Sequence, residues 1–466
     1  MSDIGFMSIV DIAKLYRKKL LHPTQVVDEY LNRIAAFDAK LGSYQEVYST
    51  SAKEMAAIAG EVFDSAYPVG PFYGIPFALK DIVHIEGRVT TGGSRAMANS
   101  ISTETSVVAQ RLLRAGGILL GKTKTVEVAM GAWGTNQNFG TPWNPWDSSI
   151  ARTPGGSSSG SGVAVAAGLA ACAIGTDTGG SVRIPSAWCG IVGLKTSEGA
   201  ISTEGIIPLS HTLDTVGPMG RCVSDVALMY EIMRGLDPTA IETMMVETDG
   251  SMVCKEIDIK RMHFGVLSAK ERAIVDPEVL DLYDEALKTL KYLGAELSTF
   301  NPPISFDKMK AATGTIIFSE GYHHHGEMYE NATDLTDSNV RPRIMSGRDI
   351  SAKDYIEALL NRKIHQKQFL SSMRGLTGLL TPTIAYPAIR LESVDEDSTP
   401  AHFTRAGNYL GLCGLSIPMG LTSKGLPAGL QILGRNDEES TVLIVGSAFE
   451  EAVAGIGHPN LNNLLN

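Results

Sequence analysis

The chain has 466 residues, of which 44% are hydrophobic and 20% charged, and a formal net charge of −11. This composition is typical of a globular protein with a substantial core, and the acidic balance argues against a nucleic-acid-binding surface, which needs clustered lysine and arginine. No run of 18 apolar residues and no basic segment with an apolar signal core is present, so we expect no membrane association and a cytoplasmic location. The five cysteines lack paired spacing, which is typical of reduced thiols.

The N-terminal segments predict helices around a buried strand. Apolar residues recur at helical spacing from Ser8 to Phe37, with a break at His22-Pro23 and Thr24 as the expected N-cap. Residues 51–63 predict a third helix. Residues 74–82 then predict a buried strand with Lys80 near its end, and burial should lower the pKa of that lysine. An exposed Lys80–Asp81 pair is disfavoured, because neighbours on a strand point to opposite faces.

Residues 116–123 (GGILLGKT) match the G-x-x-x-x-G-K-[ST] pattern of a phosphate-binding loop. Such a loop follows a strand. Here a predicted helix over residues 105–115 ends at two glycines, and the spacer Ile-Leu-Leu is itself predicted to be a core strand. We therefore predict no ATP site.

Two glycine turns that contain serine lie at residues 155–162 and 176–181, on either side of an alanine-rich apolar run. Glycine lets the backbone approach a ligand closely, and consecutive N–H groups in such a turn can hold a developing oxyanion. Serine can attack a carbonyl when a base is near. The apolar flanks argue against a flexible linker, so we predict a reaction centre here.

Two other chemistries are weaker interpretations. Residues 156–160 also satisfy G-x-S-x-G, which would make Ser158 the nucleophile of an α/β-hydrolase. However, no apolar strand precedes this segment. The fold also needs a catalytic histidine downstream, and the candidates His402 and His458 lie in no recognisable motif. The adjacent histidines at 323–325 cannot readily converge on one ion, because neighbours on a helix point about 100° apart. We expect no metal and no cofactor.

Two charged residues belong to the second turn. Asp177 is expected to cap backbone N–H groups and shape the loop. Arg183 follows Ser181 by two residues, and both an anchoring ion pair and the binding of a substrate carboxylate are open for it.

The C-terminal half continues the alternation of helices and strands. Helices are predicted over residues 277–292, with Asp276 as N-cap, over 351–369, and from 437 to about 453. The motifs lie far apart with no linker that separates them. We therefore predict one α/β domain over residues 1–466, with N-terminal helices (about 8–63), a core (about 70–230) and a specificity region (about 300–410).

The runs GGSSSGS, GTDTGGSVRIPS and GIPFALKD resemble the amidase signature family. The resemblance continues, in order, through residues 121–131, 208–221, 380–383 and 425–434. It implies an α/β fold with a large mixed, mostly parallel central sheet covered by helices on both faces.

The resemblance also implies roles for individual residues. Ser181 would be the nucleophile, Ser157 a bridging residue on a cis peptide bond, and Lys80 the base. Backbone N–H groups of Thr178, Gly179, Gly180 and Ser181 would form the oxyanion hole. Met130 and Gly131 would border the acyl pocket, with Ser158 as a further substrate-binding residue.

The function that follows from the resemblance is metal-independent hydrolysis of a small carboxylic amide through an acyl-serine, with hydrazides, carbamates and esters also compatible. The expected partner is a small-molecule amide without nucleic acid, and the expected state a monomer or homodimer. The alternative is an A subunit-like component of a glutamyl-tRNA amidotransferase, which passes ammonia to a partner. A non-enzymatic binding protein on the same scaffold is disfavoured, because all three triad residues are present.

Overall fold

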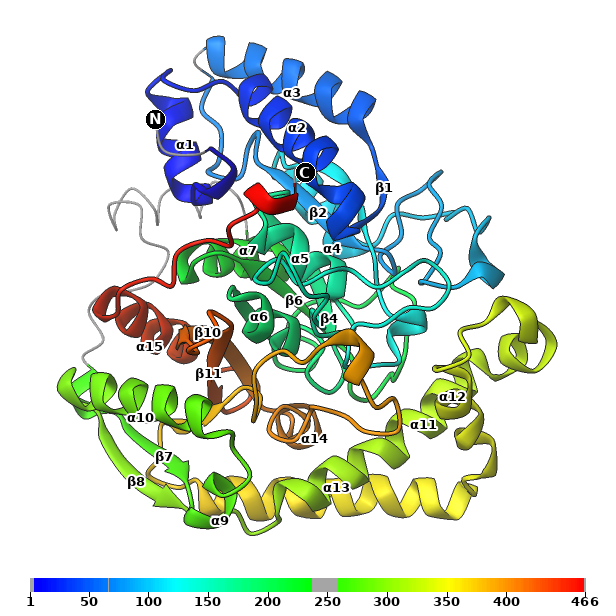
Figure 1. Ribbon diagram of the computed structural model, residues 1–466, viewed down its shortest axis with the longest axis vertical. Helices are drawn as coiled ribbons and strands as arrows, with labels where there is room; N and C mark the ends of the chain where they lie inside the picture. The colour runs from blue at the N-terminus through cyan, green and yellow to red at the C-terminus, as the bar shows by residue number, and fades with distance from the viewer. Residues whose placement is uncertain (1–3, 66, 237–258, 465–466) are drawn as a thin grey trace.

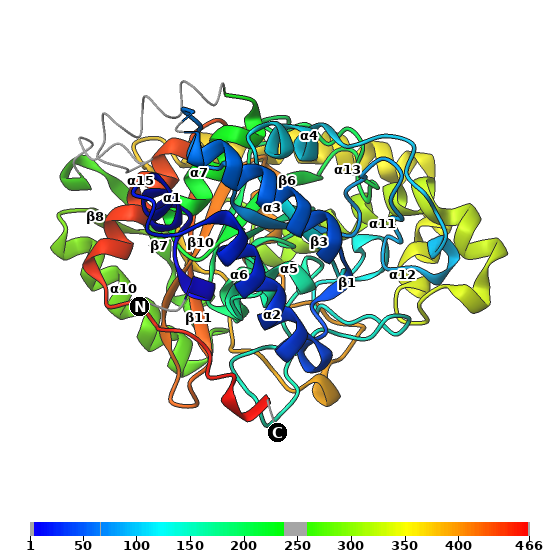
Figure 2. The ribbon, with the colours of Figure 1, turned by 90° about the horizontal axis from the view of Figure 1, so that it is seen from above.

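The computed structural model describes residues 4–65, 67–236 and 259–464. A large twisted sheet runs through the middle of the molecule, with helices around it (Figures 1 and 2). In spatial order, the strands of the described residues are β1 (Tyr44–Val47), β3 (Ile118–Thr123), β2 (Pro76–Lys80), β4 (Cys172–Asp177), β6 (Thr215–Gly220), β5 (Val192–Lys195), β10 (Cys413–Leu421), β11 (Pro427–Gly434), β9 (Gly378–Pro382), β7 (His263–Leu267) and β8 (Glu296–Phe300).

The mixed sheet is confirmed, but the expectation of a mostly parallel one is wrong. Among the described strands, six of the ten neighbouring pairs are antiparallel and four are parallel. β10 and β11 are joined directly as a hairpin, which forces them to run antiparallel. Parallel pairing is confined to β3-β2-β4 and to β9-β7-β8.

The described helices are α1 (Ile9–Arg17), α2 (Pro23–Leu41), α3 (Ser49–Asp64), α4 (Val107–Arg114), α5 (Ser159–Ala166), α6 (Arg183–Cys189), α7 (Val223–Arg234), α9 (Ala269–Arg272), α10 (Pro277–Tyr292), α11 (Phe306–Asn331), α12 (Arg341–Ser346), α13 (Ala352–Ser372), α14 (Arg405–Leu410) and α15 (Glu439–Ala452). Within the described residues, none of them has both the length and the apolar content that crossing a bilayer requires.

Helix boundaries follow the local signals closely. Asp276 caps α10 as predicted, with its side chain accepting from the N–H of Glu278. The break before α2 is also where the sequence predicts it, but the N-cap is His22 rather than Thr24. The His22 ring accepts from the N–H of Thr24, and the Gln25 side chain accepts from the N–H of His22, which completes a capping box.

Helices cover both faces of the sheet. Along β10, alternate residues point to opposite faces. Gly414 faces the Arg183 side chain of α6, whereas Leu415 packs against Gly446 of α15. α6 and α15 therefore pack on opposite faces of the same strand, and both faces are buried.

The phosphate-loop match is a strand, as predicted. Residues 118–123 form β3, which is buried and follows α4. Lys122, the lysine of that match, forms a buried ion pair with Asp81 (Nζ–Oδ1 3.2 Å). The partner of Asp81 is thus Lys122 and not its neighbour Lys80, so Lys80 is left for a different contact.

The four described cysteines, Cys172, Cys189, Cys222 and Cys413, are free thiols. The fifth, Cys254, lies outside the described residues. This agrees with the expectation of reduced cysteines.

Candidate active site

Lys80 lies at the end of β2, with its side chain fully buried. Its Nζ atom is 2.7 Å from Ser157 Oγ and 2.8 Å from Thr176 Oγ1. β2 and β4 are parallel neighbours, so their carboxyl ends meet at the same edge of the sheet. The fold therefore brings Lys80 to both glycine turns, although Ser157 is 77 residues away along the chain.

The surroundings of Lys80 favour its neutral form. Burial lowers the pKa of Lys80 to about 7, against the smaller opposing effects of Asp214 and Asp177. Near neutral pH, a substantial fraction of this amine can therefore accept a proton, which an exposed lysine cannot do.

The first glycine turn presents Ser157 to Lys80. The Gly156–Ser157 peptide bond is cis, as the resemblance implies. Only glycine fits at position 156, because a Cβ there would lie 2.7 Å from the backbone of Gly134. The Ser157 carbonyl accepts from Val126 N–H (3.2 Å) and from the Thr125 hydroxyl (3.0 Å), which fixes the orientation of the turn.

The second glycine turn leads from β4 into α6 and carries Ser181. The N–H of Ser158 donates to the Ser181 carbonyl (3.2 Å), so the two turns are in direct contact. Ser181 is 8% exposed, and its hydroxyl has no hydrogen-bond partner among the described residues. It lines a cavity of about 330 Å³. The Ser181 hydroxyl is thus on the turn next to Lys80 and Ser157, and it is accessible to a ligand.

A buried ion pair holds the second turn in shape. The Asp177 carboxylate accepts from the N–H groups of Gly180 (2.7 Å) and Val182 (3.2 Å). It also pairs with Arg183 through Nη2 (2.9 Å) and Nε (3.0 Å). Burial alone would raise the pKa of Asp177, but the guanidinium outweighs it and lowers this pKa to about 2. Asp177 caps the loop as predicted, and Arg183 is an anchor rather than a ligand for substrate.

We expect Asp177→Ala to destabilise the protein by about 3 kcal/mol or more, because the buried Arg183 would lose its counter-ion. Chemical denaturation measures the free energy of unfolding. Glu285→Ala is the control, since its pair with Lys288 is exposed and contributes little. Equal stability of the two variants would contradict this role of Asp177.

The predicted oxyanion hole needs one correction. The Gly180 N–H already donates to Asp177 and is not available to a ligand. Gly180 serves the turn through its backbone instead: its φ is +131°, and a Cβ would collide with the Thr404 side chain. The N–H groups of Thr178, Gly179 and Ser181 have no acceptor among the described residues, so they remain as candidate donors.

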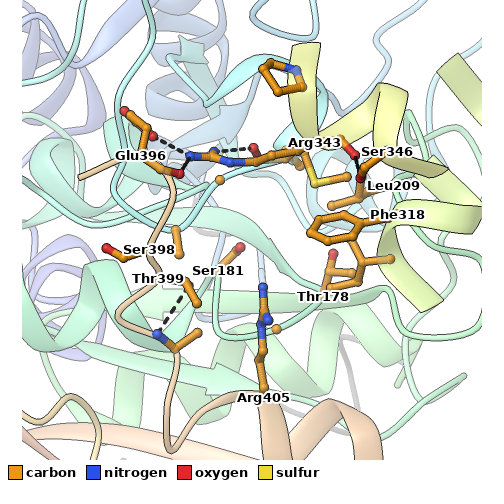
Figure 3. Close-up of a pocket in the computed structure, with 18 of the residues that line it drawn as sticks. Thr178, Ser181, Leu209, Phe318, Arg343, Ser346, Glu396, Ser398, Thr399 and Arg405 are labelled. Carbon is orange, nitrogen blue, oxygen red and sulfur yellow. Dashed lines mark hydrogen bonds and ion pairs between the residues drawn. The ribbon is translucent and has the colours of Figure 1, made fainter. Parts of the chain in front are cut away.

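The cavity in front of Ser181 is enclosed by segments from distant parts of the chain (Figure 3). Met130 and Gly131 line it, in the position that the resemblance implies. Ser158, expected as a further substrate-binding residue, does not line it. Its side chain is fully buried, and its Oγ atom bonds to the Thr176 backbone.

Sequence reasoning missed several residues of the site. Thr176 contacts Lys80, and Asp214 accepts from the Thr178 hydroxyl (2.5 Å) at the edge of the second turn. Arg343 and Arg405 line the cavity. The two arginines lie in the region expected to set specificity (300–410), but no local motif distinguishes them from other arginines there.

The histidines at 323–325 point to different partners. The His325 ring contacts the Pro208 carbonyl (2.7 Å), and His324 contacts His211 (3.3 Å). Within the described part of the chain, no group of His, Cys, Asp and Glu has an arrangement that could hold a metal ion.

Comparison with known proteins gives consistent matches over nearly the whole chain. A family model described as Amidase matches residues 25–443. The A subunit of the glutamyl-tRNA(Gln) amidotransferase of Bdellovibrio bacteriovorus is 30% identical, over 98% of this chain and 100% of the relative. Its counterpart in Geobacter metallireducens is 33% identical, over 96% and 97%. A solved structure described as an amidase superimposes with a TM-score of 0.86 at 28% identity, over 96% of this chain and 100% of that one.

These relatives overturn the expected partners. The expectation from the resemblance and the acidic charge is a monomer or homodimer that acts on a small-molecule amide without nucleic acid. Both relatives are instead named as one subunit of an amidotransferase for glutamyl-tRNA. Net charge describes a single chain and does not report what an assembly of several chains binds.

Proposed function

The chain belongs to the amidase family, hydrolases of carbon–nitrogen bonds other than peptide bonds, and from this premise we propose that it releases ammonia from a carboxamide at Ser181, as an A subunit-like component of a glutamyl-tRNA amidotransferase. The observation that carries the chemical part is the 2.7 Å contact between Lys80 Nζ and Ser157 Oγ, beside the turn that holds Ser181. The assembly part rests on the similarity to the named subunits over nearly the full length of both chains.

Acylation begins with a proton transfer. Neutral Lys80 accepts a proton from the Ser157 hydroxyl, and Ser157 in turn accepts the proton of the Ser181 hydroxyl. Ser181 Oγ then attacks the carbonyl carbon of the amide. The oxyanion of the tetrahedral intermediate is held by the N–H groups of Thr178, Gly179 and Ser181. The C–N bond then breaks, the proton returns to the leaving nitrogen, and ammonia departs. A water molecule, activated by the same relay, hydrolyses the acyl-serine.

The pH dependence of this reaction follows from the pKa of Lys80, which is lowered to about 7. The base must be neutral, so kcat/KM should rise through pH 7 and level off about one unit above it, with a tenfold fall per unit well below pH 6. Initial rates between pH 5 and 9 measure this profile. A rate that decreases steadily above pH 6 would contradict a lysine base.

The role in an assembly is tested by purifying the tagged chain from its native host, with and without its bound partners. Ammonia release from glutamine is measured for each preparation, in the presence and absence of glutamyl-tRNA. We expect release to depend on the partners and to increase with the charged tRNA. Equal turnover of simple amides by the isolated chain, unchanged by partners or tRNA, would refute the role in an assembly and leave the amidase chemistry intact.

We also propose a cytoplasmic location. The described cysteines are free thiols, and the name of the relatives refers to an aminoacyl-tRNA.

A further inference from the structure

Asp214 joins the second glycine turn to the loop before β6. Its Oδ1 atom accepts from the Thr178 hydroxyl (2.5 Å), and its Oδ2 atom accepts from the N–H groups of Leu209 (2.8 Å) and Ser210 (2.9 Å). Burial raises the pKa of Asp214, and these three bonds oppose that effect because they favour the ionised form. Figure 3 shows Thr178 on the wall of the cavity that Ser181 lines. Asp214 therefore holds a wall residue of the site with a carboxylate.

The same carboxylate lies near Lys80. Thr176 Oγ1 is 2.8 Å from Lys80 Nζ, and Thr176 and Asp214 line one small cavity of about 100 Å³. Burial lowers the pKa of Lys80, and the charge of Asp214 is the largest effect that opposes this. Asp177 acts in the same direction, but Arg183 neutralises it at 2.9 Å. The three donors to Asp214 are neutral, so its charge has no paired cation within the described part of the chain.

The loop that carries Asp214 is fixed from its other side by Glu320 of α11. Glu320 is 1% exposed and accepts from the hydroxyl (2.7 Å) and the N–H (3.2 Å) of Thr212, and from the Ser210 hydroxyl. The Tyr355 hydroxyl of α13 donates to the same carboxylate (2.7 Å). The N–H of Asp214 donates to the Ser210 carbonyl (2.8 Å). Asp214 is thus held in place by its backbone as well as by its side chain.

We propose that Asp214 is a positioning residue: it fixes Thr178 and is the counter-charge for the ammonium that forms on Lys80. The inference rests on the proposed function and adds a residue to its mechanism. When Ser181 attacks, its proton passes through Ser157 to the neutral lysine, so a positive charge develops there. A fixed negative charge nearby stabilises that state more than the ground state. Asp214 takes up no proton itself.

The test is Asp214→Asn, which keeps the size of the side chain and removes its charge. Ammonia release from glutamine is measured between pH 5 and 9 on the chain with its bound partners. At the alkaline plateau kcat should fall by about 10- to 100-fold with KM within about threefold, because the lost interactions act on the transition state. The midpoint of the rise should move about one unit below the native value near pH 7, because the ammonium loses an opposite charge. Asp214→Glu keeps the charge and should keep the midpoint.

Two further variants separate the charge from the shape of the loop. Glu320→Gln weakens the anchor of the same loop and should leave the midpoint near pH 7, since Glu320 is not among the groups that shift the pKa of Lys80. Thr178→Val removes the hydroxyl that Asp214 holds and should lower kcat without moving the midpoint. An unchanged kcat in Thr178→Val overturns the positioning role even if Asp214→Asn does not fold. A midpoint that stays in Asp214→Asn, or moves equally in Glu320→Gln, overturns the counter-charge.

Unfolding separates this inference from the proposed reaction, because it needs no turnover. The change in unfolding free energy caused by Lys80→Met is measured against pH in the native and the Asp214→Asn backgrounds. Its dependence on pH should begin near pH 7 in the native background and about one unit lower without the charge of Asp214. That shift supports the counter-charge even if the native protein releases no ammonia. The same onset in both backgrounds refutes it whatever the turnover.

Discussion

Replacing Ser181 with alanine is expected to reduce amide turnover to background, a loss of about 10⁴-fold or more, because the proposed acyl-enzyme cannot form. The fold should not change, since the Ser181 hydroxyl has no hydrogen-bond partner among the described residues. Ammonia release measures the activity, and thermal unfolding measures the stability. Labelling by a fluorophosphonate, detected by intact mass, should be lost in the same variant.

Ser158→Ala is the matched control for that experiment. Ser158 is the nucleophile of the G-x-S-x-G interpretation, but its hydroxyl is buried and bonded to the Thr176 backbone. We expect this variant to keep its fluorophosphonate labelling. Labelling that disappears in Ser158→Ala and persists in Ser181→Ala would exchange the roles of the two serines and refute the proposed mechanism.

Replacing Lys80 with methionine is the second substitution with a large expected effect. Loss of the proposed base should lower kcat/KM by about 10²- to 10⁴-fold. The rise of the rate through pH 7 should disappear with it, because that rise is assigned to the titration of this amine. Initial rates of ammonia release between pH 5 and 9 measure both effects. A variant that keeps the rise through pH 7 would show that another group is the base.

Lys80→Met should also change how the free energy of unfolding depends on pH. The pKa of Lys80 is about 7 in the folded protein and about 10.4 in an unfolded chain. Between these values the unfolded state binds one more proton, so the destabilisation caused by burying Lys80 is full below pH 7 and decreases as pH rises over that window. Lys80→Met removes the titration. Its free energy of unfolding should therefore depend less on pH between 7 and 10, and denaturation at several pH values measures this.

The sequence alone determined the local elements and the residue types of the candidate site. The apolar run before Lys80 is a buried strand, α10 starts at its predicted cap, and the phosphate-loop match is a strand. These features depend on neighbours within a few residues, and periodicity and capping report such neighbours directly. Resemblance added the pairing of Lys80 with the glycine turns, which the spacing could not provide.

Only the tertiary structure decided which groups are free and which are engaged. Asp177 accepts from the Gly180 N–H and pairs with Arg183. Arg405, more than 200 residues further along the chain, lines the cavity and forms no ion pair within the described part of the chain. The directions of the strands likewise follow from connections and register that no single segment contains. The physical reason is that hydrogen bonds and ion pairs form between atoms that meet in space, and a local pattern states what a residue can offer but not which partner reaches it.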